Sequence, residues 1–166
     1  MSSNVHIRSS HFGRGVFAAR DITEDDVILT FSGPIITFEQ AVALGVNEAN
    51  ALQIDATYYM DLEEPGRYVN HSCVPNAGIK QHTQLVALRD ISRGEEICYD
   101  YSTTMHENHW TMICKCGASG CRKIVRDFRS LSEPLQRRYL DLEIVQPFIV
   151  LQLLLDREPE QKRVRG

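Results

Sequence analysis

The sequence lacks both a long apolar run and a start of the secretory type. Its longest apolar segment, residues 148–155, is interrupted by Gln152 and is far shorter than the roughly 20 residues of a membrane span. The first residues, Met1-Ser2-Ser3-Asn4, form neither a basic nor an apolar stretch, which argues against a signal peptide. We therefore expect no membrane contact and an intracellular, reducing compartment, either cytoplasm or nucleus.

An excess of positive charge is also missing, because the formal net charge is −4 at pH 7. Direct binding of nucleic acid needs a basic face for the phosphates, so we expect no direct nucleic-acid ligand. Acidic residues instead cluster at Glu24-Asp25-Asp26, at residues 61–64 and at Glu95-Glu96. Such clusters are usually solvated surface, and the alternative is a groove that attracts a cationic peptide.

The first hundred residues lack the regular alternation of strands and helices that parallel sheets require. Short β-prone runs recur there between turn signals such as Ser32-Gly33-Pro34 and Ser92-Arg93-Gly94. The predicted strands cover residues 5–8, 16–19, 27–31, 35–37, 77–82 and 85–88. The sequence thus predicts a single domain of the mainly β (α+β) class, with a small appendage, rather than a Rossmann-like sheet.

Helical signals are few and lie mostly at the C-terminal end. Thr37 and Gln40 have the spacing of a capping box and predict one short inserted helix. Near the other end, Ser130 or Ser132 can cap a helix that carries Leu135, Tyr139 and Leu142 on one face. Pro147 ends that pattern and can open a second helix through Leu155, so residues 130–157 are predicted to form a C-terminal helical extension.

Disulfide bonds are not expected. Five cysteines are an odd number, and three of them form the cluster Cys114-x-Cys116-x4-Cys121. In a reducing compartment, such clustering favours a metal over disulfides. Structural zinc sites are tetrahedral and need four ligands. Spacing alone leaves four candidates for the fourth ligand: Cys73, Cys98, His106 and His109.

Two segments combine polar and aromatic side chains and a thiol more densely than a surface loop requires. The first is Arg67-Tyr68-Val69-Asn70-His71-Ser72-Cys73-Val74-Pro75-Asn76, and the second is Gly94-Glu95-Glu96-Ile97-Cys98-Tyr99-Asp100-Tyr101. A core strand could satisfy so many polar groups only if each had a partner. We interpret the two segments as parts of a functional site.

These segments resemble the motifs of SET-domain protein lysine methyltransferases. Residues 12–22, which begin Phe12-Gly13-Arg14-Gly15, resemble the opening motif of that family. Residues 67–76 resemble its central motif, residues 94–101 its third motif, and residues 114–122 its post-SET zinc element. The resemblance implies a SET-domain fold of small curved sheets with a knot-like C-terminal segment. It divides the chain into a SET domain (residues 5–112), a post-SET zinc element (113–125) and the helical extension (130–157).

The resemblance also implies an activity and its residues. The chain would transfer a methyl group from S-adenosyl-L-methionine to the ε-amine of a lysine in a basic protein or peptide. Tyr101 would be the catalytic tyrosine. The cofactor-binding residues would be Gly13, Arg14, Gly15, Asn70 and His71.

Lysine must react as a neutral amine although its free pKa is about 10.4. An apolar channel favours that form, and the sequence supplies tyrosines for it at positions 58, 59, 68, 99 and 101. In the family, the position of Tyr99 helps to set the number of methyl groups added. A tyrosine there predicts mainly mono- or dimethylation.

The resemblance selects Cys73 as the fourth ligand of one structural Zn²⁺, with Cys114, Cys116 and Cys121. Trp110 is a candidate for stacking on the adenine of the cofactor, or else a core residue. Cys98 is expected to be a buried strand residue.

Some features depart from the family pattern. Residues 61–67 lack the Asn-x-Ala that often precedes the central Arg in histone-modifying members, and Lys123 stands where Gly is common. These departures leave histone and non-histone substrates open. The apolar stripe of the C-terminal helices can pad the fold or form a dimer contact, so a monomer and a homodimer both stay open. Two alternatives to an enzyme are a catalytically silent SET module that binds a lysine-containing peptide and a small zinc-binding interaction domain.

Overall fold

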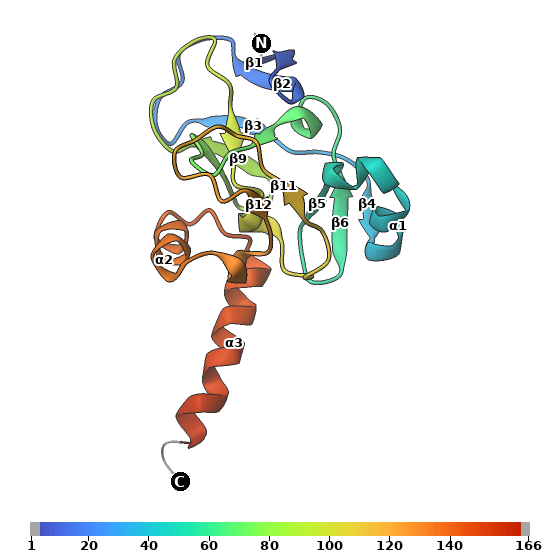
Figure 1. The fold of residues 1–166 in the computed structure, drawn as a ribbon, viewed down its shortest axis with the longest axis vertical. Coiled ribbons are helices and arrows are strands. Elements are labelled where there is room, and N and C mark those ends of the chain that lie inside the picture. The colour runs from blue at the N-terminus through green and yellow to red at the C-terminus, as the bar shows by residue number, and fades with distance from the viewer. Residues whose placement is uncertain (1–3, 164–166) are drawn as a thin grey trace.

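The computed structural model describes residues 4–163, and the side chains of residues 4–156. Short strands dominate the first 125 residues, and the longer helices follow (Figure 1). The strands are β1 (Val5–Ser10), β2 (Gly13–Ala18), β3 (Val27–Thr30), β4 (Ile35–Thr37), β5 (Ala51–Gln53), β6 (Tyr58–Asp61), β7 (Asn70–His71), β8 (Ala77–Lys80), β9 (Gln84–Ala87), β10 (Cys98–Tyr99), β11 (Met112–Ile113) and β12 (Ile124–Val125). The helices are α1 (Phe38–Ala43), α2 (Glu133–Asp141) and α3 (Pro147–Arg163), with 3₁₀ turns η1 (Gly45–Asn50), η2 (Gly66–Tyr68), η3 (Tyr101–Thr104) and η4 (Phe128–Ser130).

The described strands form small separate sheets instead of one large sheet. Three are two-stranded, β1-β2, β10-β7 and β11-β12, and two are three-stranded, β3-β9-β8 and β4-β6-β5. The pairs are antiparallel except for β7 and β10. The mainly β prediction is therefore confirmed, and the six predicted runs correspond to β1–β4, β8 and β9. The remaining strands have two to four residues, too few to show a period of two.

One apolar core joins β1–β3, β8 and β9, and it includes the fully buried Val16, Leu85 and Ile97. A second core lies beneath the C-terminal helices around Phe128, Tyr139, Ile144 and Ile149. Because residues from Leu131 to Leu153 share this core with Leu88 and Phe128, this part of the C-terminal extension packs onto the body of the protein. No described helix is long and apolar enough to cross a membrane.

The helix start at Thr37 is as predicted. The Thr37 hydroxyl accepts a hydrogen bond from the Gln40 backbone, and the Gln40 side chain accepts one from the Thr37 backbone. The helix is shorter than the apolar pattern suggested, because α1 ends at Ala43 and Val46 lies exposed in η1. At the other end, α2 begins after Ser132 and α3 begins at Pro147.

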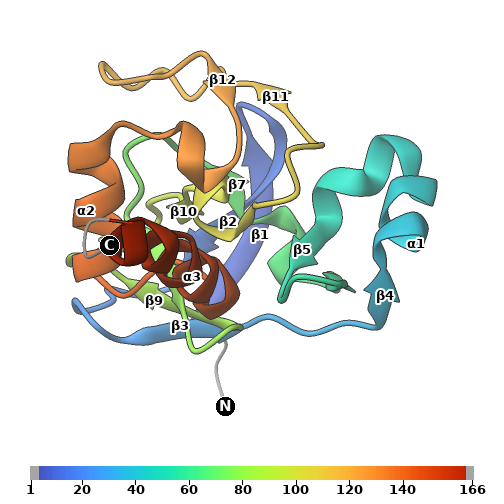
Figure 2. The same ribbon diagram turned by 90° about the horizontal axis from the view of Figure 1, so that it is seen from below.

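The helices lie on two sides of the sheets. Figure 2 shows α1 on one side, next to β4 and β5, and α2 and α3 on the opposite side, near β9 and β10. In Figure 1, α3 projects away from the body of the protein. The strands β7 and β10, which belong to the two polar motifs, lie between these two sides.

Candidate active site

A two-residue parallel pair brings the two polar motifs together. Asn70 of β7 lies opposite Cys98 of β10, and His71 lies opposite Tyr99. The backbone bond from the Ser72 N–H to the Tyr99 carbonyl continues the pairing. The 3₁₀ turn η3 begins one residue after β10, with Asp100 between them, and Tyr101 lies beside His71 at a ring-centroid distance of 5.3 Å.

Beside this pair lies a cavity of about 620 Å³, called here the large cavity. Its walls come from the loop before β2, from η1, η2 and β7, and from the segment around β11. The lining residues are Phe12, Arg14, Ala49, Asn50, Arg67, Tyr68, Asn70, His71, Tyr101, Met112, Ile113, Cys114 and Lys115. Of the predicted cofactor residues, Arg14, Asn70 and His71 line it.

Two glycines, Gly13 and Gly15, lie at the start of β2, the strand that packs beside Asn70. Gly13 has φ +104°, in a region that side chains other than glycine rarely adopt. A Cβ on Gly15 would collide with the Glu96 carboxylate and lie 3.1 Å from Asn70 Nδ2. Glycine therefore lets β2 approach Asn70 closely.

Asn70 is held by its amide nitrogen. Nδ2 donates to the Arg14 carbonyl at 3.0 Å and to Glu96 Oε1 at 2.8 Å. Because the donors are used inside the protein, the amide oxygen is the group that Asn70 can offer to a ligand in the large cavity.

His71 is neutral and has a defined tautomer. Burial lowers the pKa of His71 to about 4, against the opposite effect of the Asp100 carboxylate. Nδ1 accepts the backbone N–H of Tyr101 at 3.2 Å, so the ring proton is on Nε2. Nε2 lies 3.4 Å from Cys73 Sγ, to which it donates.

Arg14 lies over a tyrosine at the mouth of the large cavity. Its guanidinium carbon is 4.1 Å from the ring centroid of Tyr68, and Nη1 donates to the Tyr68 hydroxyl at 2.8 Å. The Tyr68 hydroxyl in turn donates to Glu64 at 3.0 Å. The cation–π contact orients a positive charge at the cavity.

On the other side of Tyr101 is a narrow cavity of about 30 Å³, called here the small cavity. Its lining is rich in aromatic rings and contains two carboxylates. The residues are Ala41, Glu48, Ala49, Ala51, Leu52, Gln53, Tyr59, Tyr99, Tyr101, Thr104, Met105, Glu107 and Trp110. Tyr101 and Ala49 line both cavities.

Tyr101 is fixed in this dividing position. Its hydroxyl donates to the Val69 carbonyl at 2.9 Å, and its ring lies 4.8 Å from that of Tyr99. Burial raises the pKa of both Tyr99 and Tyr101, so both hydroxyls are protonated at neutral pH. With its hydrogen engaged by Val69, the Tyr101 oxygen presents its lone pairs to a group between the cavities.

The two carboxylates in the lining of the small cavity are those of Glu48 and Glu107. Glu107 also lines a shallow depression on the surface with Phe38 and Tyr58. Desolvation raises the pKa of Glu107. Glu48 lies 3.0 Å from His109 Nε2, so this pair joins η1 to the segment before the cysteine cluster.

Four thiols form a compact cluster next to His71. One ligand atom from each of Cys73, Cys114, Cys116 and Cys121 lies within 4.8 Å of the others, and Cys73 Sγ is 3.7 Å from Cys114 Sγ. A tetrahedral zinc ion with Zn–S bonds of about 2.3 Å separates its sulfurs by about 3.8 Å. The donor set fits zinc, and the four cysteines could hold one ion.

The other three candidates for the fourth ligand lie elsewhere. Cys98 is on β10, His109 pairs with Glu48, and the His106 ring lies 6.5 Å from that of Phe148. None of the three belongs to the thiol cluster among the described residues.

Two predicted aromatic residues lie outside the large cavity, and one of them, Trp110, packs partly buried against a core cluster that includes Met105 and Val125. Trp110 lines the small cavity, 6.2 Å from the Tyr101 ring, and is not among the residues of the large cavity. Tyr58 is exposed and lines neither cavity, whereas Tyr59 lines the small cavity and Tyr68 the large one.

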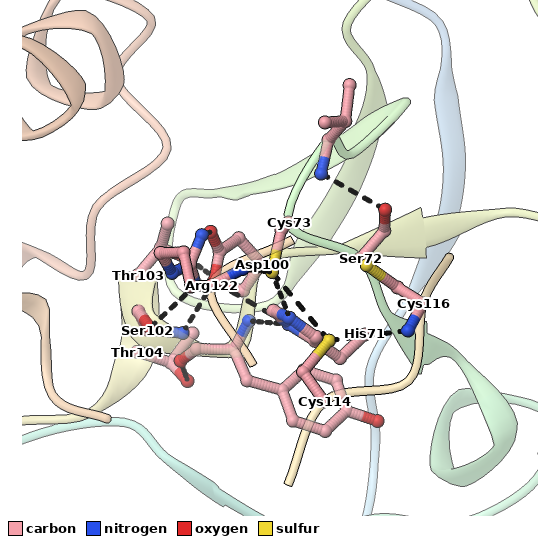
Figure 3. A network of polar contacts seen from close by, with 12 residues as sticks. His71, Ser72, Cys73, Asp100, Ser102, Thr103, Thr104, Cys114, Cys116 and Arg122 are labelled. Carbon is pink, nitrogen blue, oxygen red and sulfur yellow. Dashed lines mark hydrogen bonds and ion pairs between the residues drawn. The ribbon is translucent and has the colours of Figure 1, made fainter. Parts of the chain in front are cut away.

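Asp100 is a site residue that the motif analysis passed over. Its carboxylate is buried and forms a bidentate ion pair with Arg122, with N···O distances of 2.7 and 2.8 Å. Figure 3 shows this pair beside His71 and the thiol of Cys73. The sequence held two signals for this pair: Asp100 stands between two tyrosines, and Arg122 directly follows Cys121.

Comparisons with known proteins show the family of the chain. A family model described as "SET domain" matches residues 13–102. "Histone-lysine N-methyltransferase trr" of Drosophila melanogaster is 32% identical over 144 residues, which covers 73% of this chain and 6% of the relative. "Histone-lysine N-methyltransferase 2B" of Homo sapiens is 29% identical over 134 residues, with 71% and 5% covered.

A third relative is the "Histone-lysine N-methyltransferase, H3 lysine-4 specific" of Schizosaccharomyces pombe, 33% identical over 135 residues, with 68% and 14% covered. The chain thus spans only a small part of the length of these relatives. Among solved structures, a humanized mutant of the Chaetomium thermophilum Polycomb Repressive Complex 2 bound to the inhibitor GSK126 matches with a TM-score of 0.54 and 23% identity, covering 63% of this chain and 16% of that one. This likeness supports the fold.

Proposed function

The chain belongs to the SET-domain family, and from this premise we propose that it is an S-adenosylmethionine-dependent protein-lysine N-methyltransferase. One observation carries the proposal. Tyr101 forms part of the wall of a large cavity on one side and of a narrow aromatic cavity on the other. A transfer between two substrates requires such a shared point, because donor and acceptor must meet in line.

The large cavity is suited to the cofactor. S-adenosylmethionine supplies a methyl group that its sulfonium already activates. Around it, Asn70 offers an amide oxygen to the amino group, and Arg14 offers a positive charge to the carboxylate. We assign His71, which lines this cavity, to the same site, together with Gly13 and Gly15, which flank Arg14 in the sequence.

The small cavity is suited to the lysine. A ring of Tyr59, Tyr99 and Trp110 desolvates the amine and so favours its neutral, nucleophilic form. The Tyr101 oxygen, with its hydrogen donated to Val69, orients the amine and the methyl group through its partial negative charge. The chain thus aligns the reactants and keeps water away from them.

Glu48 and Glu107 at the small cavity support a basic substrate. Carboxylates that line a narrow cavity attract a lysine with cationic neighbours. Since the named relatives are histone-lysine methyltransferases, a histone tail is one substrate of this kind. Tyr99, buried beside Tyr101, leaves limited space next to the amine and favours mono- or dimethylation.

The thiol cluster would hold one structural zinc ion that ties the post-SET element, residues 113–125, to the SET domain, residues 5–112. Because Cys73 directly follows Ser72 and His71 in the wall segment, the ion would stabilise the cofactor site. Thiolate ligands persist in a reducing compartment, in agreement with a cytoplasmic or nuclear protein.

Calorimetric titration with S-adenosylmethionine tests the cofactor site. Asn70→Ala removes the amide that bonds to β2 and faces the large cavity. We expect the affinity for S-adenosylmethionine to fall roughly tenfold or more, as for the loss of one to two hydrogen bonds to a charged group. The exposed Asn47 provides the matched control, since Asn47→Ala should bind like the wild type. Equal affinity in all three proteins would remove Asn70 from the cofactor site, and a wild type that does not bind S-adenosylmethionine would favour the zinc-binding interaction domain.

A further inference from the structure

The Asp100 carboxylate joins three segments that lie far apart in the sequence. Asp100 itself stands between Tyr99 and Tyr101. Arg122 comes from the cysteine segment, and Tyr139 comes from helix α2 of the C-terminal extension. The Tyr139 hydroxyl donates to Asp100 Oδ2 at 2.9 Å, and both residues are almost fully buried.

A buried carboxylate needs a full set of donors, because an unpaired buried charge is strongly destabilising. Oδ1 accepts from Arg122 Nη2 at 2.8 Å and from the Ser102 N–H at 3.1 Å. Oδ2 accepts from Arg122 Nη1 at 2.7 Å and from the Tyr139 hydroxyl. Tyr139 is thus one of four donors, and it is the one supplied by the C-terminal extension.

The position of this carboxylate fixes the backbone that carries the two site tyrosines. Through its bond with the Ser102 N–H, Asp100 caps the turn η3, whose first residue is Tyr101. The same stretch of backbone presents the Tyr101 N–H to His71. If the carboxylate shifts, the cap and the Tyr101 ring shift with it, away from the position between the cavities.

We propose that Tyr139 is a positioning residue for methyl transfer: its hydroxyl holds Asp100 and, through Asp100, the backbone of Tyr99 and Tyr101. Tyr139 is not among the residues that line either cavity, so it acts without touching a reactant. The C-terminal helical extension then helps to position the active-site tyrosines in addition to packing on the core. The kinetic part of this inference rests on the proposed function.

Tyr139→Phe isolates the hydroxyl. The phenylalanine ring keeps the packing of Tyr139 against its apolar neighbours in the second core. The matched control is Gln146→Met, since the buried Gln146 side chain donates to the His82 carbonyl at 2.9 Å. That bond also ties the C-terminal extension to the sheets, but it does not involve Asp100.

The experiment combines steady-state kinetics with NMR of the ring-labelled tyrosines in the free, zinc-loaded protein. The chain has six tyrosines, so the signals of Tyr99 and Tyr101 can be assigned by single substitutions to phenylalanine. For Tyr139→Phe we expect kcat about tenfold lower, as for a slightly misplaced reacting group, with both KM values within about twofold of the wild type. The Tyr99 and Tyr101 signals should move in this variant and stay in place in Gln146→Met.

Two results would overturn the inference. One is a Tyr139→Phe protein whose kcat and tyrosine signals match those of Gln146→Met, which would give Tyr139 a packing role only. The other is a lower kcat with unmoved Tyr99 and Tyr101 signals. If the wild type transfers no methyl group, the proposed function fails, and the tyrosine signals alone still decide whether Tyr139 positions Tyr101.

Discussion

At the scale of single residues, the site depends on tyrosines whose surroundings make them different from one another. Tyr101 donates its hydrogen to Val69 and divides the two cavities. Tyr99 is buried next to it, 6.0 Å from the Phe31 ring. Tyr58, by contrast, is exposed on β6. Burial and neighbours, more than residue type, give each its role.

Tyr99 should limit how many methyl groups are added. Tyr99 lines the small cavity, so Tyr99→Phe removes a hydroxyl from the proposed lysine site, and the freed space admits an amine that already carries methyl groups. We expect the most methylated product to rise by at least one methyl group in mass spectra of a lysine peptide. Tyr58→Phe is the control, and an unchanged product distribution in Tyr99→Phe would contradict the assignment.

At the scale of elements, the four thiols connect the short strand β7 to the segment around β11 and β12. Cys73 follows β7, whereas Cys114, Cys116 and Cys121 lie between or beside β11 and β12. A hydrogen bond supports the same connection, since the Arg122 backbone N–H donates to Cys73 Sγ at 3.4 Å. A metal here would thus hold one wall of the large cavity, which includes Met112 and Cys114.

Loss of one thiol should therefore affect both metal and cofactor. For Cys73→Ser we expect zinc content, measured by metal analysis after mild chelation, to fall to less than about half, because structural sites need four ligands. Affinity for S-adenosylmethionine should fall in parallel, because β7, which carries Asn70 and His71, is then no longer tied to the zinc ion. Cys98→Ser, outside the cluster, is the control. Full zinc content in Cys73→Ser would place the fourth ligand elsewhere.

The sequence predicts the elements that contain local signals and misses those that depend on distant pairing. The capping box at Thr37 needs only residues three apart, and it forms as expected. Strands β7 and β10 have two residues each, and their pairing becomes visible only once the chain is folded. The place of Trp110 in the small cavity likewise depends on how the segment before β11 crosses Tyr101.

At the scale of the whole molecule, a set of small sheets holds two cavities on either side of one tyrosine. Helix α1 and the turn η1 contribute to the wall of the small cavity, and the β11 segment contributes to the wall of the large cavity. The C-terminal extension supports the motif around Asp100 through the hydrogen bond from Tyr139. The chemistry of the motifs was evident in the sequence. The existence of two separate cavities was not evident in the sequence, because each is lined by segments that meet only in the folded chain.

Transfer of a labelled methyl group is the measurement that tests the central claim most directly. Wild-type protein and Tyr101→Phe are each incubated with labelled S-adenosylmethionine and a cell lysate, and modified residues are identified by mass spectrometry. The account predicts label on lysine ε-amines with the wild type, and at least a hundredfold less with Tyr101→Phe, as for removal of a catalytic electrostatic contact. Cofactor binding without any lysine methylation would contradict it and identify a silent SET module.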